Sequence, residues 1–357
     1  TNPTKKTNKI VHKDIAKIEK ISAINLKESG QDGFRLNYFD NKKSYKDSEL
    51  LGDICFISKG MVLNSDEIKY KSEFRKDDLI SDKRDEEHPK KYIEAKNIQR
   101  YLIKEIRYLE WGTKRIPKRL SRKTFPELYE GDKIMSGMIT ESTFDDSGIV
   151  SNHSISILKR FTDLKRINNK SIESSIKKNN GKSREELEAE SSKFNLKYIL
   201  AILNSKWAYT FLRNISRSKI SFYPDDLRKL PIKKLPLFEQ KPFIEKVDLI
   251  LELNKQFYEK KDKFLKLIKH EYKLEDISRK LDSFYELDFD EFVKQLKIKL
   301  NIDKKSELLN FFEKNKKEVL DISDKIEKVD EEINNMVYDL YGITKEEREI
   351  IENGQQT

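Results

Sequence analysis

The segment FIEKVDLILELNKQFYEKKDKFLKLI, residues 243–268, carries its seam residues at alternating steps of four and three. The segment VLDISDKIEKVDEEINNMVYDL, residues 319–340, carries apolar residues at steps of three and four. This spacing places the side chains in one stripe along a helix, and such a stripe needs a partner helix. Each helix would have about 25 residues and a length of about 40 Å. Because the simplest partner of each helix is the other, the sequence predicts a coiled-coil-like strut.

Two polar positions interrupt the first seam. The predicted seams are Phe243, Val247, Ile250, Asn254, Phe257, Lys261, Phe264 and Ile268 in one helix, and Val319, Ile322, Ile326, Val329, Ile333, Met336 and Leu340 in the other. The polar members, Asn254 and Lys261, cost stability but can fix the register of the helices. Residues 274–312 are expected to form a small helical cap between the two helices. An ordinary helical bundle is the alternative to a coiled-coil strut.

The chain before the strut has the pattern of a β-rich domain. Residues 50–63 carry alternating apolar positions and end at a turn-like Asn-Ser-Asp, as expected of a strand. Residues 128–140 and 148–161 also have strand patterns, whereas residues 91–109 fit a strand or a helix. We therefore predict an α+β fold, in which a mixed, β-rich domain precedes long helices that form a coiled-coil-like strut with a small helical cap.

The same patterns suggest domain boundaries. Residues 1–46 are polar and charged and are expected to be an arm or linker. Residues 47–236 are assigned to the β-rich domain, and residues 237–357 to the helical spacer. Within the first domain, residues 165–193 almost lack large apolar side chains and are predicted to be an exposed or disordered loop. Residues 194–215 are predicted to be an amphipathic helix, followed by a connector punctuated by prolines.

Composition limits the function classes. The 357 residues include 73 Lys and Arg against 63 Asp and Glu, and 38% are charged against 36% hydrophobic. This argues for an elongated body, and the 11 glycines argue against a nucleotide-binding α/β domain. The one cysteine excludes an intrachain disulfide and suits a reducing cytoplasm. Because there is no signal-like or membrane-spanning run and no starting Met, we expect a cytoplasmic piece of a longer protein.

A cluster of basic residues points to a polyanionic partner. Residues 100–123 contain nine Lys and Arg and two Glu, interleaved with Tyr101, Tyr108 and Trp111. Together with a net charge of +10, this is the footprint of a nucleic-acid-binding protein. A solvated basic face is the alternative. A membrane surface is less favoured, because the basic residues form no clear amphipathic helix.

Catalytic motifs are few. Asp225, Glu239 and Lys241 have the spacing of a PD-ExK metal nuclease, which needs its carboxylates on adjacent strands. Prolines break this segment, and Glu239 falls where a helix should begin, so the nuclease is a minor alternative. The chain has no Asn-Pro-Pro-Tyr or Asp-Pro-Pro-Tyr element, and its four histidines show no ligand spacing. We predict neither a catalytic residue nor a metal site in this chain.

Several phrases together resemble a known family. They are LLGDICFISKGMVLNSDE (50–67), KSEFRKDDLISDKRDEEHPKKYIEAKNIQRY (71–101), LEWGTKRIPKRLSRKTFPELYEGDKI (109–134), GIVSNHSISILKRF (148–161), FNLKYILAILNSKWAYTFLRN (194–214), LRKLPIKKLPLFEQKPFIEKVDLILELN (227–254) and INNMVYDLYGITKEEREIIE (333–352). In this order they are similar to the target recognition domain and spacer of type IIG restriction–modification enzymes, which are fused adenine methyltransferase–endonucleases. They also resemble type I specificity subunits. The resemblance covers residues from about 50 to 352.

The resemblance implies that the chain recognises a DNA sequence and does not itself catalyse a reaction. It implies a specificity domain that recognises double-stranded DNA and positions a methyltransferase, with or without an endonuclease, in the same enzyme or a partner subunit. That catalytic part would use S-adenosylmethionine and Mg²⁺, and this chain would need no cofactor. A coiled-coil protein-interaction module without DNA specificity is the alternative.

A recognition domain needs phosphate contacts for affinity and base contacts for specificity. The candidates for phosphate contacts are Lys114, Arg115, Lys118, Arg119, Arg122, Lys123, Arg213, Arg217 and Lys219. The candidates for base readout, which lie on two predicted loops, are Lys59, Asn64, Ser65, Asp66, Thr140, Glu141 and Ser142. Lys would pair with guanine, Asn with adenine and Glu with cytosine. The aromatic residues Trp111, Phe222 and Tyr223 are expected to pack rather than to stack on bases.

Overall fold

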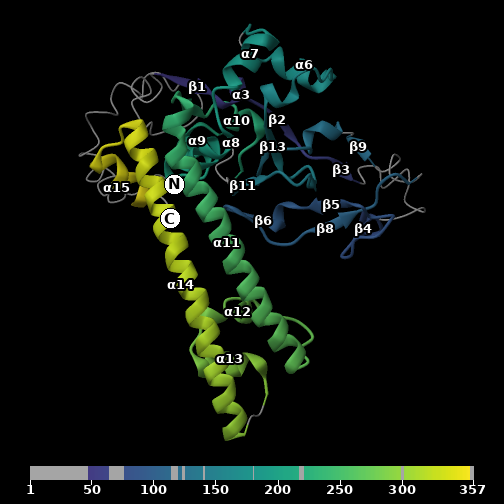
Figure 1. Cartoon of the computed structure of the whole chain (residues 1–357), viewed down its shortest axis with the longest axis vertical. Helices are drawn as coiled ribbons and strands as arrows, with labels where there is room; N and C mark the ends of the chain where they lie inside the picture. Colours follow the sequence, from purple (N-terminus) through teal and green to yellow (C-terminus); the bar gives the residue numbers. More distant parts are fainter. Residues whose placement is uncertain are drawn as a thin grey trace, which may run out of the picture.

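The computed structural model of the chain describes most residues from 47 to 353 (Figure 1). The described ranges are 47–63, 76–113, 120–122, 125–139, 141–179, 181–216, 221–298 and 301–353. The predicted arm, residues 1–46, lies outside them. The fold is mixed α+β, as predicted: a β-rich body comes first, and two long helices then extend away from it.

A four-stranded antiparallel sheet forms the centre of the body. Its strands, in spatial order, are β11 (Ser142–Asp145), β10 (Lys133–Ser136), β13 (Ser156–Arg160) and β2 (Cys55–Lys59). Successive side chains of a strand point to opposite faces. Ile57 and Leu158 therefore join one hydrophobic cluster, and Phe56 and Ile157 join another. This main sheet is buried on both faces.

Shorter strands surround the main sheet. A second sheet contains, in order, β12 (Val150–Ser151), β5 (Lys90–Ile93), β8 (Arg107–Leu109) and β4 (Ile80–Ser81). The two-stranded pairs are β1 (Ser48–Leu50) with β14 (Pro231–Lys233), β3 (Val62–Leu63) with β9 (Leu120–Arg122), and β6 (Ile98–Gln99) with β7 (Leu102–Ile103). The short helices among them are α3 (Leu51–Ile54), η1 (Lys76–Leu79), η2 (Ala95–Asn97), η3 (Pro126–Leu128), η4 (Phe161–Leu164) and α10 (Pro224–Leu227). Residues 91–109, which fitted either a strand or a helix, are mainly short strands.

The predicted amphipathic helix is two helices, α8 (Leu196–Leu203) and α9 (Lys206–Ile215). The break falls at Asn204 and Ser205, where the Ser205 hydroxyl accepts a hydrogen bond from the backbone N–H of Ala208. Serine is a preferred helix N-cap because it satisfies one of the unpaired backbone donors of the first turn. The chain therefore turns after α8, and α9 takes a new direction.

The prediction of a loop at residues 165–193 was wrong, although many residues of this segment are exposed, as predicted. The segment contains two helices, α6 (Lys170–Ile176) and α7 (Arg184–Ser191). Ser183 and Glu186 form a reciprocal capping box at the start of α7. One apolar residue of each helix, Ile172 and Leu187, is buried in the cluster on one face of the main sheet. Good caps and one anchor per helix thus compensate for the low apolar content.

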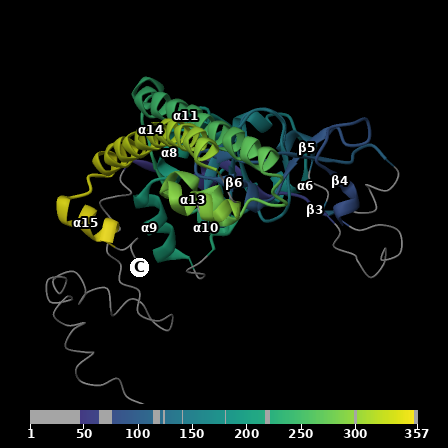
Figure 2. The same cartoon turned by 90° about the horizontal axis from the view of Figure 1, so that it is seen from below.

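The strut consists of α11 (Leu237–Glu271) and α14 (Ile302–Tyr341), which lie side by side in both views (Figures 1 and 2). The buried seam residues are Phe243, Val247, Ile250, Phe264 and Ile268 of α11 and Val319, Ile322, Val329 and Ile333 of α14, in agreement with the heptad prediction. Near the body the buried stripe of α14 departs from the predicted seam, because Met336 and Leu340 are only half-buried. Tyr341 is buried instead, since the end of α14 packs on α9, where the Tyr341 ring stacks on Trp207 with centroids 3.6 Å apart.

The two polar seam residues of α11 form hydrogen bonds to groups other than the side chains of α14. The Asn254 side-chain amide donates to the carbonyl of Ile250 in its own helix, at 2.8 Å. The Lys261 ammonium donates to Asp282 of the cap, also at 2.8 Å. Asn254 therefore satisfies its amide within α11, and Lys261 ties α11 to the cap.

A small helical cap closes the far end of the strut, as predicted. It contains α12 (Arg279–Asp282), η5 (Phe284–Glu286) and α13 (Phe289–Leu296). Four phenylalanine rings fill its core, with Phe264 stacked on Phe284 at 4.0 Å and Phe292 stacked on Phe312 at 4.6 Å. The cap is thus held by aromatic packing between both long helices and the segment that joins them.

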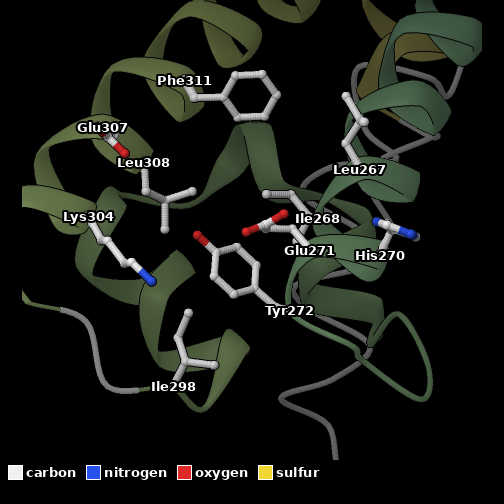
Figure 3. Close-up of a pocket in the computed structure, with 10 residues that line it drawn as sticks. All are labelled: Leu267, Ile268, His270, Glu271, Tyr272, Ile298, Lys304, Glu307, Leu308 and Phe311. Atoms are coloured by element: carbon white, nitrogen blue, oxygen red, sulfur yellow. The ribbon is translucent and has the colours of Figure 1, made fainter.

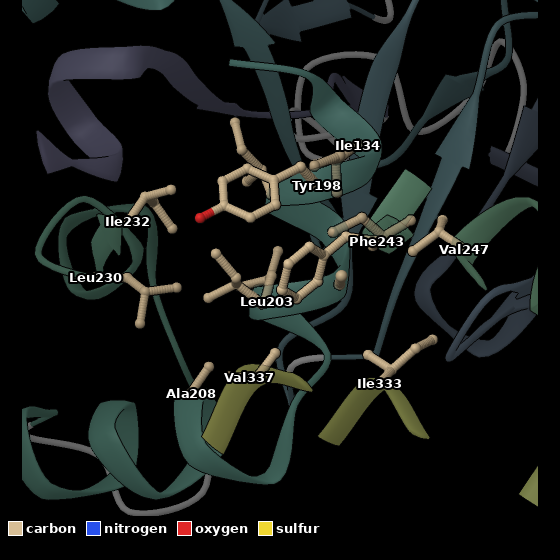
Figure 4. Close-up of a cluster of buried hydrophobic side chains, with 14 of the residues drawn as sticks. Ile134, Tyr198, Leu203, Ala208, Leu230, Ile232, Phe243, Val247, Ile333 and Val337 are labelled. Carbon is tan, nitrogen blue, oxygen red and sulfur yellow. The ribbon is translucent and has the colours of Figure 1, made fainter. Parts of the chain in front are cut away.

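One hydrophobic core joins the body to the strut (Figure 4). Ile134 of the main sheet, Tyr198 of α8, Phe243 of α11 and Ile333 of α14 belong to the same buried cluster. The edge of the Phe243 ring meets the Tyr198 ring at a centroid distance of 5.2 Å. The division of the chain near residue 236 stays a prediction, and the core is continuous across it. Helix α15 (Lys345–Asn353) follows α14 and adds Ile351 to this core.

Among the helices of the described ranges, none combines the length and the apolar character that crossing a bilayer requires.

The shared core predicts a large effect of a single strut residue. Ile333 is fully buried where α14 meets the body, so Ile333→Ala should lower the free energy of unfolding by about 2–5 kcal/mol. Leu249→Ala on α11, where the side chain is 44% exposed, should change it by less than about 0.5 kcal/mol. Urea titration of both variants measures this, and equal effects would contradict the shared core.

Candidate nucleic-acid interface

The register of the main sheet aligns four polar residues at one end of it. Ser142 pairs with Ser136, Ser136 with Ser156, and Ser156 with Lys59, across β11, β10, β13 and β2. The Ser142 hydroxyl donates to the Ser136 hydroxyl at 2.9 Å. We call this end of the sheet the serine end. It brings together two candidate base-readout positions, Lys59 and Ser142, that lie more than 80 residues apart in the sequence.

A third segment packs on the serine end. The backbone N–H of Phe222 donates to the carbonyl of Met138, in the turn between β10 and β11, at 2.7 Å. The next residue, Tyr223, lies beneath Lys59, with the ammonium 4.8 Å from the ring centroid. Tyr223 is 44% exposed and Ile139 of the same turn is 55% exposed. The serine end therefore presents a cation, an aromatic ring and an apolar side chain to solvent.

Helix α9 extends this surface. Its buried face packs on the core through Trp207, Ala208, Phe211 and Leu212. On the more exposed face, Tyr209 meets the Phe222 ring edge-on at 5.9 Å, and Lys206 and Arg213 lie one turn before and after it. Lys206, Tyr209, Ile139 and Glu141 line a hollow of 270 Å³ together with Arg100, Asn204 and Ser205. Glu141 is exposed at the rim of this hollow.

The β3–β9 pair joins the two segments that carry most candidate contacts. Leu63, the last residue of β3, pairs with Leu120, the first residue of β9. The chain continues from Leu63 into Asn64, Ser65 and Asp66, and it reaches Leu120 from Lys118 and Arg119. Leu63 and Leu120, which are the described residues next to these candidates in the sequence, therefore lie side by side.

The structure describes some of the candidate DNA-contact residues and leaves others outside the described ranges. Among the phosphate candidates, Arg213 lies on the half-buried face of α9 and Arg122 has its backbone in β9. Among the base-readout candidates, Lys59 and Glu141 are placed at the serine end. The candidates that lie outside the described residues are Lys114, Arg115, Lys118, Arg119, Lys123, Arg217, Lys219, Asn64, Ser65, Asp66 and Thr140.

The prediction that Ser142 reads a base was wrong. Ser142 is the first residue of β11 rather than part of the loop, and its side chain is buried. Its N–H donates to the side-chain oxygen of Asn204 at 3.1 Å, and its carbonyl accepts from the Asn204 amide at 2.9 Å. These bonds hold its backbone in the core, so Ser142 supports the turn that carries Glu141 and presents no side chain to a ligand.

Of the three aromatic residues predicted to pack, two do so and one lies at the surface. Phe222 is buried and Trp111 packs against the second core cluster, in agreement with the prediction that they pack. Tyr223 differs, because α10 begins directly after it and leaves its ring at the surface. The Pro224 that starts α10 was the signal in the sequence, since proline is favoured in the first turn of a helix.

The nuclease alternative does not fit the geometry of its three residues. Asp225 lies in α10, where Arg228 pairs with its carboxylate at 2.5 Å. Glu239 and Lys241 lie in the first turns of α11. The motif needs carboxylates on adjacent strands, and these residues are on helices. In the described part of the chain, His, Cys, Asp and Glu side chains form no group of three that could hold a metal ion.

Hydrogen bonds of Arg100 with Asp330 and Asn204, which we call the polar joint, connect the serine end to the strut. The Arg100 guanidinium donates to both carboxylate oxygens of Asp330 on α14, at 3.0 and 2.6 Å, and to the carbonyl of Asn204 at 2.7 Å. Burial alone would lower the pKa of Arg100, but the Asp330 carboxylate raises it, so Arg100 stays charged. Asn334 of α14 accepts from the N–H of Lys206 at 2.8 Å. Sequence reasoning missed this joint, because nothing local links residues 230 positions apart.

Another hollow lies at the far end of the strut (Figure 3). It has a volume of 610 Å³, and Leu267, Leu308 and Phe311 provide part of its apolar lining. Leu267 and Phe311 are both partly exposed there. The lining also carries charges of both signs, from Lys304, Glu271 and Glu307.

The comparisons with known proteins reach only the strut. Residues 237–337 match a family model described as a domain of unknown function (DUF8810). The match covers α11, the cap and most of α14. A comparison with curated proteins found no match for the chain.

The backbone at Gly60 lies close to the backbone of residues 151 and 152, so a methyl group at Gly60 is predicted to destabilise the fold. A Cβ added to Gly60 would lie 2.3 Å from the carbonyl oxygen of Asn152 and 2.4 Å from that of Ser151. Gly60→Ala should therefore lower the free energy of unfolding by about 1–3 kcal/mol through overpacking. Gly137→Ala is the control, because its Cβ would meet the Glu141 carbonyl at an ordinary 3.5 Å. Thermal unfolding of both variants tests this, and an unchanged Gly60→Ala would contradict the close approach.

The polar joint predicts an energetic coupling between body and strut. In a double-mutant cycle of Arg100→Ala and Asp330→Ala, we expect an interaction energy of about 0.5–3 kcal/mol, because the pair makes two direct hydrogen bonds. The exposed pair Lys260 and Glu318, 2.6 Å apart between α11 and α14, should couple by less than about 1 kcal/mol. Urea unfolding measures both cycles. A coupling of Arg100 with Asp330 no larger than that of the control pair would contradict the joint.

Proposed function

We propose that this chain is the sequence-specific double-stranded DNA recognition module of a restriction–modification system. In this proposal it positions a separate or N-terminal adenine-N6 methyltransferase, with or without an endonuclease, on its target site. The observation that carries the proposal is the serine end, where segments far apart in the sequence bring Lys59, Tyr223 and Glu141 to one surface. The resemblance of the sequence phrases to recognition domains is the second support.

The chemistry of this surface suits contact with DNA. A Lys ammonium pairs with phosphate or with the acceptor edge of guanine, and a Glu carboxylate accepts from the amino group of cytosine. Lys59 and Glu141 supply these groups, and the exposed Ile139 can contact a thymine methyl group. Arg213 of α9 supplies a phosphate contact beside them. The net charge of +10 favours binding to any duplex before the sequence is read.

The strut would set the distance to the catalytic part. Helices of 35 and 40 residues have lengths of about 50 and 60 Å. Because α8, α11 and α14 share one core with the main sheet, the direction of the strut is fixed relative to the serine end. A catalytic domain that holds the strut would therefore meet the duplex at a defined distance from the recognised bases. That domain, and not this chain, would bind S-adenosylmethionine and Mg²⁺.

A second candidate function rests on the other end of the strut. The hollow at the tip exposes apolar side chains, and the matched family region is the strut alone (Figure 3). A coiled-coil protein-interaction module without DNA specificity would use this tip. It would bind its partner without dependence on the basic residues of the body.

Selection from a random duplex library at two salt concentrations tests the proposal. We expect enrichment of one short motif and an affinity that falls steeply with salt, because phosphate contacts release counterions. Arg213→Ala should weaken binding to all sequences alike and reduce the salt slope by about 1. Lys59→Ala and Glu141→Ala should each relax one base position, by about 1–3 kcal/mol of discrimination. Lys266→Ala, on an exposed face of α11, is the control and should change neither.

Two results would contradict the proposal. If no duplex is retained at low salt, DNA is not the partner, and a salt-insensitive protein partner would support the second candidate. If duplexes are retained with no enriched motif, the chain by itself does not recognise a sequence.

A further inference from the structure

A hollow of 360 Å³ lies at the end of the main sheet opposite the serine end. There β10 begins at Lys133 and β11 ends at Asp145. Residues of the second sheet form one side of the hollow, and the turns before β10 and after β11 form the other. Its volume falls in the range of about 300–1,000 Å³ that small-molecule sites occupy.

Cations and an aromatic ring dominate the lining. Arg84, Lys90 and Lys91 provide three positive charges, and Glu130 provides one negative charge. The Lys90 ammonium lies 5.9 Å from the centroid of the Trp111 ring. The ring is half-buried and packs against the second core cluster, and the backbone N–H of Trp111 donates to the Glu87 carbonyl at 2.9 Å. The hollow thus has a flat, fixed aromatic wall with cations beside it.

A buried ion pair holds the opposite wall in place. The Lys133 ammonium is fully buried, pairs with Asp145 and donates to the Tyr129 carbonyl at 2.6 Å. The same Asp145 carboxylate accepts from the backbone N–H groups of Ser147 and Ile149, both at 3.0 Å. Burying two charges is costly, and the surrounding hydrogen bonds offset that cost. The turns on this side of the hollow are therefore pre-organised by one charge pair.

We propose that this hollow binds one nucleotide unit, with its base against Trp111 and its phosphate among Arg84, Lys90 and Lys91. Aromatic side chains stack on any base, and cations beside them neutralise the phosphate. The unit can come from two sources, a free nucleoside monophosphate or an unpaired nucleotide of a strand. This site is distinct from the serine end in place and chemistry, so it does not depend on the recognition of duplex DNA.

The fluorescence of Trp111 gives a direct measurement. The chain has two tryptophans, and Trp207 is fully buried and stacked on Tyr341, so a ligand in solution reaches Trp111. Titration of the full chain with deoxyadenosine monophosphate should change the fluorescence to saturation. Inorganic phosphate and deoxyadenosine, each supplying half of the unit, should bind more weakly. Hexadeoxyadenylate distinguishes the sources, because tighter binding than the monophosphate supports a strand nucleotide and equal or weaker binding supports a free nucleotide.

Charge variants test the placement of the phosphate. The double variant Lys90→Gln, Lys91→Gln should weaken binding about tenfold or more, because hydrogen bonds from cations to phosphate are among the strongest polar contacts. Lys96→Gln, an exposed lysine of η2 outside the hollow, should stay within about twofold, since it retains every contact with the ligand. Trp111→Leu, followed by equilibrium dialysis, should weaken binding of the monophosphate more than that of phosphate.

Three results would overturn the proposal. One is the absence of a saturable change up to about 10 mM monophosphate, which is weaker than any specific site of this size. The second is equal binding by the double variant and the Lys96→Gln control. The third is binding of phosphate as tight as that of the nucleotide, because the aromatic wall would then contribute nothing. The near-ultraviolet circular dichroism of each variant shows whether it is folded.

Discussion

Helix α8 lies between the main sheet and the strut, and the rest of the structure depends on its burial. Every residue of α8 except Lys197 is buried. The Lys197 ammonium donates to Asp248 of α11 at 2.5 Å, so even this half-buried position contacts the strut. A helix that is apolar on nearly all sides has to be covered on all sides. The sheet covers one side and α11 and α14 cover the other, so the body and the strut form one hydrophobic core.

Polar contacts then give this shared core its direction. Hydrophobic packing is non-directional, whereas the two hydrogen bonds between Arg100 and Asp330 fix an angle as well as a distance. Asn204 connects the same arginine to the first residue of β11. The turn that carries Ile139 and Glu141 is therefore held against α14 through two residues. The surface proposed to meet DNA and the strut proposed to meet a catalytic domain are therefore connected by one core and one chain of hydrogen bonds.

Part of this arrangement could be predicted from the sequence, and there is a physical reason why the rest could not. The strut was predictable because heptad spacing is a local pattern that only a paired helix satisfies. The helices at 170–191 were not, because their stability comes from caps such as Ser183 with Glu186 and from one buried residue each. Lys59 lies at the surface and stays a candidate, whereas Ser142 is buried because the segment between the predicted strands 128–140 and 148–161 contains a strand of its own, β11. Arg100 and Asp330 meet only through the fold, and a single sequence carries no signal of such a pair.

The pairing of Leu63 with Leu120 has a consequence for how the body is connected. Strands β4, β5 and β8 lie between these two residues in the sequence, so the β3–β9 ribbon closes the stretch of chain that supplies three of the four strands of the second sheet. Closing a stretch of chain costs conformational entropy, and this cost rises only slowly with the number of residues enclosed. A change that weakens the pairing of β3 with β9 would therefore release both ends of that stretch at once, whereas the fourth strand, β12, lies outside it in the sequence.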